Sequence, residues 1–154
     1  MTAETKVKEP LQEELERLEM ALDTPPVPGE MTSWASMIRK NFDAASKAIL
    51  SEIDSGHREK LREIEGQDAE LLARTQQLRD DDKGHKEWCR QLGETIAAFE
   101  ANAARAGADE KQVLEQQQAL VEEGLRFVTH VRKQERALRS WLQEAFERDT
   151  GLGD

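Results

Sequence analysis

Two short stretches of this chain place a carboxylate and an imidazole three residues apart. Asp54 precedes His57 and Asp82 precedes His85, in the related segments Asp-Ser-Gly-His-Arg-Glu and Asp-Lys-Gly-His-Lys-Glu. Residues three apart lie on one face of a helix, so each pair could point together into a helical bundle. Di-iron bundles use inward-pointing Glu-x-x-His pairs in this way, which makes a transition-metal site the sharpest chemical hypothesis.

The candidate ligands of such a site are Asp82, His85, His130 and Glu135. A di-iron site needs more carboxylates on facing helices than these segments supply. If one continuous helix carries both pairs, His57 and His85 lie about 42 Å apart and cannot share a metal. We therefore expect no metal and no cofactor, and keep the metal-binding four-helix bundle as the alternative function.

Other catalytic patterns are missing from the sequence. It has no P-loop, no glycine-rich dinucleotide turn, no nucleophile elbow and no Cys/His spacing for zinc. The single cysteine, Cys89, lies at a position of the apolar stripe described below and is interpreted as a small buried hydrophobic residue. The sequence therefore predicts a protein that is not an enzyme.

The composition favours long helices that bury a narrow stripe. Charged residues make up 35% of the 154 residues, hydrophobic residues 37% and aromatic residues 5%. The net charge of −10 and a pI near 4.9 argue against nucleic acid as a partner. No segment has the length and hydrophobicity of a membrane span or a signal peptide, so an acidic cytoplasmic protein is expected.

A stripe with the spacing of a coiled coil runs from His57 to Ala106. Steps of four and three residues from His57 give Leu61, Ile64, Asp68, Leu71, Thr75, Leu78, Asp82, His85, Cys89, Leu92, Ile96, Phe99, Ala103 and Ala106. The two Asp-x-Gly-His segments lie 28 residues apart within or beside this stripe. They indicate either two helix breaks or a repeat inside one long helix, and we favour the long helix with bends. Whether the helix continues through Gly56 and Gly84 stays open.

A turn is predicted next, at residues 106–109. Gly107 suits the left-handed end of one helix, and Asp109 with Gln112 forms a capping box for the next. The two long helices are then antiparallel, which places Asp80 to His85 beside His130 to Glu135. The predicted polar layer consists of Asp82, His85, Arg132, Lys133, Glu135 and Arg136.

Five basic residues and one Glu occupy the stretch from Arg126 to Arg139. We interpret this stretch as neutralising Asp80, Asp81 and Asp82 across the hairpin. The alternative is an anionic-surface binder that uses the stretch against lipid or phosphate.

The first 30 residues read as a flexible N-terminus that contains a short helix at 10–22 and a Pro-rich linker. Leu11, Leu15, Leu18 and Leu22 form one apolar stripe, which we expect to dock on the last helix near Trp141 and Phe146. Residues 31–149 form the helical hairpin or bundle domain, and 150–154 are a frayed tail.

The sequence thus predicts an all-α fold in which long antiparallel helices form a coiled-coil-like hairpin or bundle. A compact up-down-up-down four-helix bundle is the alternative. The predicted function is that of a structural or adaptor protein acting through coiled-coil protein–protein interaction. Its partners are other proteins of unknown identity, and copies of itself as a homo-oligomer, because the stripe of the last helix is broader than one neighbour would cover.

Overall fold

The described part of the chain is a bundle of α-helices. The computed structural model describes residues 9–67 and 72–151, and these contain no strand. No helix within these ranges combines the length and the apolar character needed to span a membrane. The all-α prediction is confirmed.

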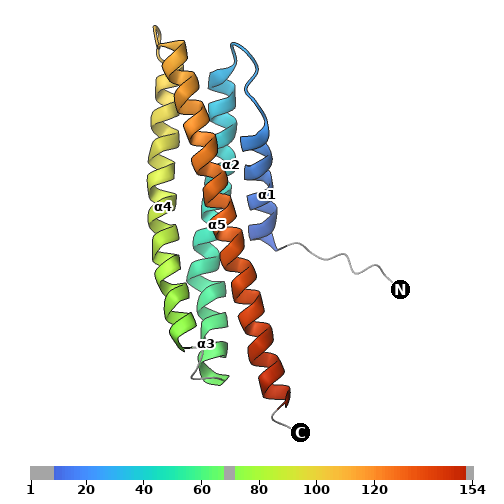
Figure 1. Ribbon diagram of the computed structural model, residues 1–154. Helices are drawn as coiled ribbons and strands as arrows, with labels where there is room; N and C mark the ends of the chain where they lie inside the picture. The colour runs from blue at the N-terminus through green and yellow to red at the C-terminus, as the bar shows by residue number, and fades with distance from the viewer. Residues whose placement is uncertain (1–8, 68–71, 152–154) are drawn as a thin grey trace, which may run out of the picture.

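Four helical segments alternate in direction along the bundle (Figure 1). Helix α1 (Pro10–Asp23) is joined by the Pro-rich loop to α2 (Met31–Ser51), which continues through the π-helix η1 (Glu52–His57) into α3 (Arg58–Gln67). Helices α4 (Leu72–Ala104) and α5 (Glu110–Gly151) form the second pair. Each helix contacts its neighbours in sequence, and α1 also contacts α5, which closes the bundle.

The continuous helix expected from His57 to Ala106 is wrong. The pairs Arg39–Glu100, Asp54–Lys86 and His57–Asp82 join the two arms of an antiparallel hairpin, because one number falls as the other rises. The chain therefore reverses between the end of α3 and the start of α4. The seam positions Asp68 and Leu71 lie outside the described residues. Periodicity did not reveal the reversal, because both arms bury their stripes in the bundle. The spacing of three and four residues therefore continues from one arm to the next.

Neither Asp-x-Gly-His segment breaks its helix. The first lies in η1, a π-helix. The wider turn of this helix explains why the buried positions Ile49, Ile53, His57 and Leu61 follow one another at intervals of four residues. The second lies inside α4, which passes through Gly84 without interruption. Because α3 and α4 are antiparallel, the two segments face each other rather than follow each other along one rod.

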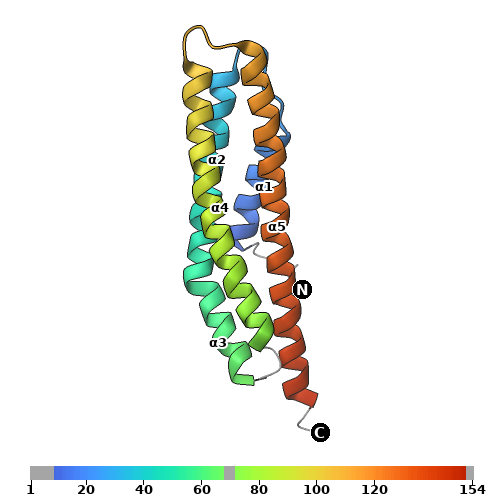
Figure 2. The same ribbon diagram turned by 60° about the vertical axis from the view of Figure 1, so that its left-hand side comes forward.

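Helix α1 is an integral part of the bundle. Its leucines are buried in one core with side chains of α2, α4 and α5. Leu22 packs on α5 at Gly124, where an added Cβ would lie 2.8 Å from Leu22 Cδ1. Docking on α5 was expected. The expected position near Trp141 is wrong, because Trp141 packs in a separate cluster, and the side chain of Phe146 lies outside the described residues. Figure 2 shows α3, α4 and α5 continuing past the end of α1.

Two apolar cores occupy the described part of the bundle. The larger joins α1, α2, α4 and α5, and the smaller consists of Leu61, Leu78 and Leu138 with Trp141 and Leu142 packed against it. Between them lies a layer of buried polar side chains, described below. At the other end of the molecule Gly107 turns the chain from α4 to α5 with φ 77°. Asp109 Oδ1 accepts a hydrogen bond from the Lys111 backbone N–H at 3.1 Å, and the Gln112 side chain makes no bond to Asp109.

Candidate functional site

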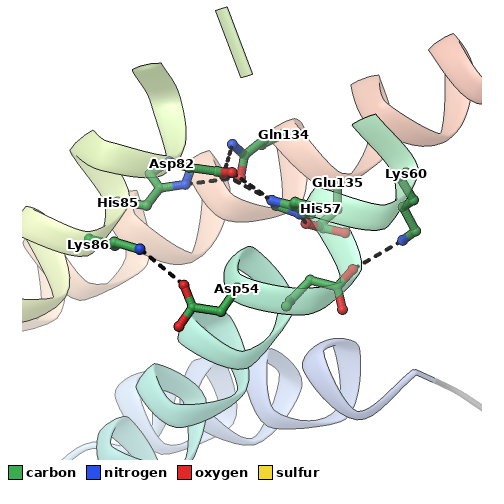
Figure 3. Close-up of polar contacts among 9 residues, drawn as sticks. Asp54, His57, Lys60, Asp82, His85, Lys86, Gln134 and Glu135 are labelled. Carbon is green, nitrogen blue, oxygen red and sulfur yellow. Dashed lines mark hydrogen bonds and ion pairs between the residues drawn. The ribbon is translucent and has the colours of Figure 1, made fainter. Parts of the chain in front are cut away.

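A buried imidazole lies between two carboxylates from different helices. His57, whose exposed fraction is 2%, projects from η1 into the bundle. Its Nδ1 lies 2.9 Å from Asp82 Oδ1 of α4, and its Nε2 lies 2.5 Å from Glu135 Oε1 of α5 (Figure 3). The arrangement ties three helices together through one ring, because each ring nitrogen has a different carboxylate partner.

Two more side chains complete this polar layer. Gln134 donates from Nε2 to Asp82 Oδ1 at 2.8 Å, and its Oε1 lies 3.0 Å from His85 Nδ1. The layer therefore consists of His57, Asp82, His85, Gln134 and Glu135. In the described part of the chain every buried side-chain nitrogen and oxygen has a hydrogen-bond partner. Such satisfaction matters because an unpaired buried polar group costs stability.

The two histidines of the layer have opposite charge preferences. Burial alone would lower the pKa of His57, but its hydrogen bonds to Asp82 and Glu135 and the charges of these carboxylates raise it to about 9. His57 is therefore an imidazolium at neutral pH, and both ring nitrogens donate. Burial lowers the pKa of His85, against the opposing effects of Gln134 and Asp82. The neutral His85 ring donates from Nδ1 to the Gln134 carbonyl oxygen.

The π-helix η1 places a further carboxylate, that of Glu52, between the polar layer and the solvent. Gly56 leaves room for the carboxylate of Glu52, which would clash with a Cβ at that position. Lys60 Nζ contacts the same oxygen at 3.1 Å. Burial on its own would lower the pKa of Lys60, but this hydrogen bond and the charge of Glu52 raise it. Glu52 thus extends the layer outwards, toward solvent.

Two grooves of opposite charge flank the layer. The groove between α3 and α4, about 410 Å³, has two acidic residues, Asp54 and Asp82, and five basic ones, Arg58, Arg62, Arg79, Lys83 and Lys86. The groove between α1 and the helix from α2 to α3, about 450 Å³, is lined by Glu9, Glu52, Glu59 and Glu63, with Lys60 as its one basic residue. Cations are therefore attracted to the second groove and anions to the first.

The structure divides the residues that the sequence placed in a polar layer. Asp82, His85 and Glu135 lie together. Arg132 instead pairs with Glu19 of α1 at 2.6 Å, and Lys133 and Arg136 are exposed. The predicted register of the hairpin is accurate only to within a few residues. A shift of one residue turns a helical side chain by about 100°, so the register alone could not identify which side chains point inward.

Two further expectations about charges are wrong. The stretch from Arg126 to Arg139 does not neutralise the aspartates of α4, because Asp82 bonds to His57 and Gln134. Asp80 and Asp81 accept hydrogen bonds from Gln76 and Gln77 on their own helix. The metal candidates Asp82, His85, His130 and Glu135 do not form one set either. His130 is exposed and packs against Trp88, with ring centroids 5.2 Å apart.

The sequence analysis missed His57 and Gln134 as members of the layer. The repeat was the available signal for His57, because two Asp-x-Gly-His segments on antiparallel helices bring the histidine of one to the aspartate of the other. That pairing, His57 with Asp82, is accompanied by the pairing of Asp54 with Lys86 at 3.1 Å. Nothing in the sequence around Gln134 predicted its burial, because the same surrounding residues could equally flank an exposed glutamine on a helix.

No protein-family model, curated protein or solved structure matches this chain. We therefore infer function from the chemistry of the polar layer and of the surface grooves.

Proposed function

We propose that the protein is a non-enzymatic helical adaptor that binds another protein chain, or a second copy of itself, at the loop end of the bundle. The proposed binding surface is called the tip groove. It lies between the Pro-rich loop and the turn from α4 to α5, has a volume of about 480 Å³, and has apolar lining from Pro28, Met31, Ala103, Ala108, Val113 and Leu114.

The exposure of Leu114 carries the proposal. This leucine is 46% exposed at the edge of the tip groove. Its neighbours Val113 and Gln117 on the same helix are buried, so Leu114 lies outside the buried stripe. Val27, in the loop beside the groove, is 58% exposed. An apolar groove with an exposed leucine at its edge is typical of a surface that receives the apolar face of a partner helix.

The interior supports a structural role for the polar layer. His57, Asp82 and Glu135 of the layer are hydrogen-bonded to one another. Burial raises the pKa of the Cys89 thiol, which disfavours the reactive thiolate. A polar layer in a bundle also restricts helix register, since a shifted register would leave its charges unpaired. A rigid bundle with a fixed register suits a protein that presents a surface to partners.

Site-specific photo-crosslinking tests the proposal. A photoreactive residue at position 114 should crosslink in cells to one predominant protein, or to a second copy as judged by doubled mass. The matched control is position 20 on α1, because Met20 is 69% exposed but lies outside the tip groove.

Leu114→Arg and Met20→Arg provide the second comparison. Leu114→Arg should abolish co-purification of the crosslinked partner, or lower the association constant of a homodimer at least tenfold in sedimentation equilibrium, while Met20→Arg should leave both unchanged. Equal crosslinking from positions 114 and 20, or equal effects of the two arginines, would count against the tip groove as the binding surface.

A further inference from the structure

We propose that Glu52, His57 and Glu135 form a binding site for one divalent transition-metal ion. One ligand atom from each residue lies within 4.8 Å of the others. Ligand atoms bound to one such ion at about 2.0–2.2 Å lie roughly 3 to 4 Å apart. Small side-chain rotations that move Glu52 inward and widen the 2.5 Å contact between His57 and Glu135 would bring the set to this spacing.

The surroundings of His57 suit a metal ligand. Asp82 accepts the proton of Nδ1 at 2.9 Å, which leaves Nε2 as the nitrogen directed at Glu135. Gln134 in turn holds Asp82 by a 2.8 Å hydrogen bond. A carboxylate on the far nitrogen of an imidazole fixes the ring and its tautomer in metal sites, and this partner is already in place here.

The backbone at the site supports the same inference. Glu52 and His57 are the first and last residues of η1, and π-helical turns inside α-helices occur frequently at functional sites. Any side chain at position 56 would displace the Glu52 carboxylate, so Gly56 keeps the space in which that carboxylate lies. The acidic groove lined by Glu9, Glu52 and Glu59 leads from solvent to this carboxylate and would attract a cation.

In the proposed site the metal ion takes over the positive charge that the His57 imidazolium now supplies. The ion would take the lone pair of His57 Nε2, and the proton now shared with Glu135 would leave to solvent. Lys60 would release Glu52, to which it is bound at 3.1 Å. The product pairs two carboxylates and a neutral imidazole with a divalent ion. One nitrogen and two oxygen donors favour Zn²⁺, Co²⁺, Fe²⁺ or Mn²⁺ over Ca²⁺ and Mg²⁺, which take oxygen ligands.

Titration of the EDTA-treated full-length protein with Co²⁺ and with Zn²⁺ tests the site. We expect one Co²⁺ per chain with a visible absorption band, and displacement of this band by Zn²⁺. Glu52→Gln removes a direct carboxylate ligand and should weaken binding at least tenfold, since even the loss of an outer-shell contact in a metal site costs about 10- to 100-fold. This variant keeps both hydrogen bonds of His57, so the fold is retained and circular dichroism can verify it.

Two controls decide the outcome. Glu59→Gln removes the same charge from the same groove and should change the Co²⁺ affinity less than threefold. His130→Ala removes the exposed imidazole and should leave the absorption band intact. Absence of stoichiometric binding by the unaltered protein, equal losses from Glu52→Gln and Glu59→Gln, or loss of the band in His130→Ala would each overturn the proposed site.

Discussion

The imidazolium of His57 compensates two carboxylates that the fold removes from water. Asp82 and Glu135 are both buried, at 6% and 5% exposure, and come from different helices. Burying a carboxylate is tolerable only with a charged or hydrogen-bonding partner, and His57 supplies one to each. The stability of the layer therefore depends on the proton that makes His57 a cation.

The metal-free protein should lose stability in alkaline solution. Because folding raises the pKa of His57 from 6.5 to about 9, its stabilising contribution is complete below pH 6.5 and is lost as pH rises through 9. The shift corresponds to about 3 kcal/mol. Urea unfolding in EDTA between pH 6 and 10 should show this decline. Below pH 6.5 the lowered pKa of His85 should also cost stability. A free energy of unfolding that is constant between pH 7 and 10 would refute the charged state assigned to His57.

Removing the cation should be costlier than removing the whole ionic group. His57→Leu leaves Asp82 and Glu135 buried without their partner and should lower the free energy of unfolding by roughly 3 to 5 kcal/mol. The triple variant with leucine at positions 57, 82 and 135 should recover part of this loss in denaturant unfolding. His130→Leu, at an exposed imidazole, is the control and should change stability by less than about 0.5 kcal/mol. A triple variant less stable than His57→Leu would contradict the argument.

At the scale of the helices, glycines within helical segments serve different purposes. Gly84 has open space where a side chain would lie, so it only weakens α4. Gly124 lets α1 approach α5, since an added Cβ would lie 2.8 Å and 3.0 Å from the two terminal carbons of Leu22. Helix propensity and close packing therefore predict opposite effects for the same substitution.

Gly84→Ala should stabilise the protein by about 0.5 to 1 kcal/mol. Gly124→Ala should destabilise it by about 1 kcal/mol or more, because overpacking against buried Leu22 outweighs the gain in propensity. Thermal and urea unfolding of both variants measure these changes. In a Leu22→Ala background the cost of Gly124→Ala should disappear. If Gly124→Ala were as stabilising as Gly84→Ala, α1 could not lie this close to α5.

At the scale of the whole molecule, α1 completes the bundle over the larger core. It buries Leu11, Leu15, Leu18, Ala21 and Leu22, and the Trp34 indole donates a hydrogen bond to the carbonyl of Thr24 at 2.8 Å. Burial of four leucines contributes on the order of 8 kcal/mol, similar to the total stability of a small domain. Residues 10–23 therefore belong energetically to the bundle that begins at Met31.

Deleting residues 1–30 should abolish or greatly lower the cooperative thermal transition. The fluorescence of Trp34 should shift to longer wavelength, because the deletion uncovers its ring and removes its hydrogen-bond acceptor. The same deletion in a variant whose only tryptophan is Trp141 should shift the fluorescence less under native conditions. Trp141 packs on the smaller core beyond α1. The milder Leu15→Ala should cost about 2 to 5 kcal/mol. An unchanged melt after deletion would show that α1 does not cover the core.

The sequence by itself determined the helices and most of their buried faces. Spacing of three and four residues predicted the buried stripes of α1 and α4, and Gly107 marked a turn. These features depend on neighbours within a few residues, where periodicity, proline geometry and glycine conformation act directly. The antiparallel register of α4 and α5 also followed, because a short turn fixes which residues are level.

Only the tertiary structure decided which helices meet and which charges pair. The reversal between α3 and α4 places His57 beside Asp82, although the sequence reasoning separated His57 from His85 by the length of a long helix. Gln134 enters the layer and Lys133 leaves it because a rotation of one residue exchanges a buried position for an exposed one. Such choices minimise the number of unpaired buried charges over the whole bundle, and no local stretch of sequence contains all the partners.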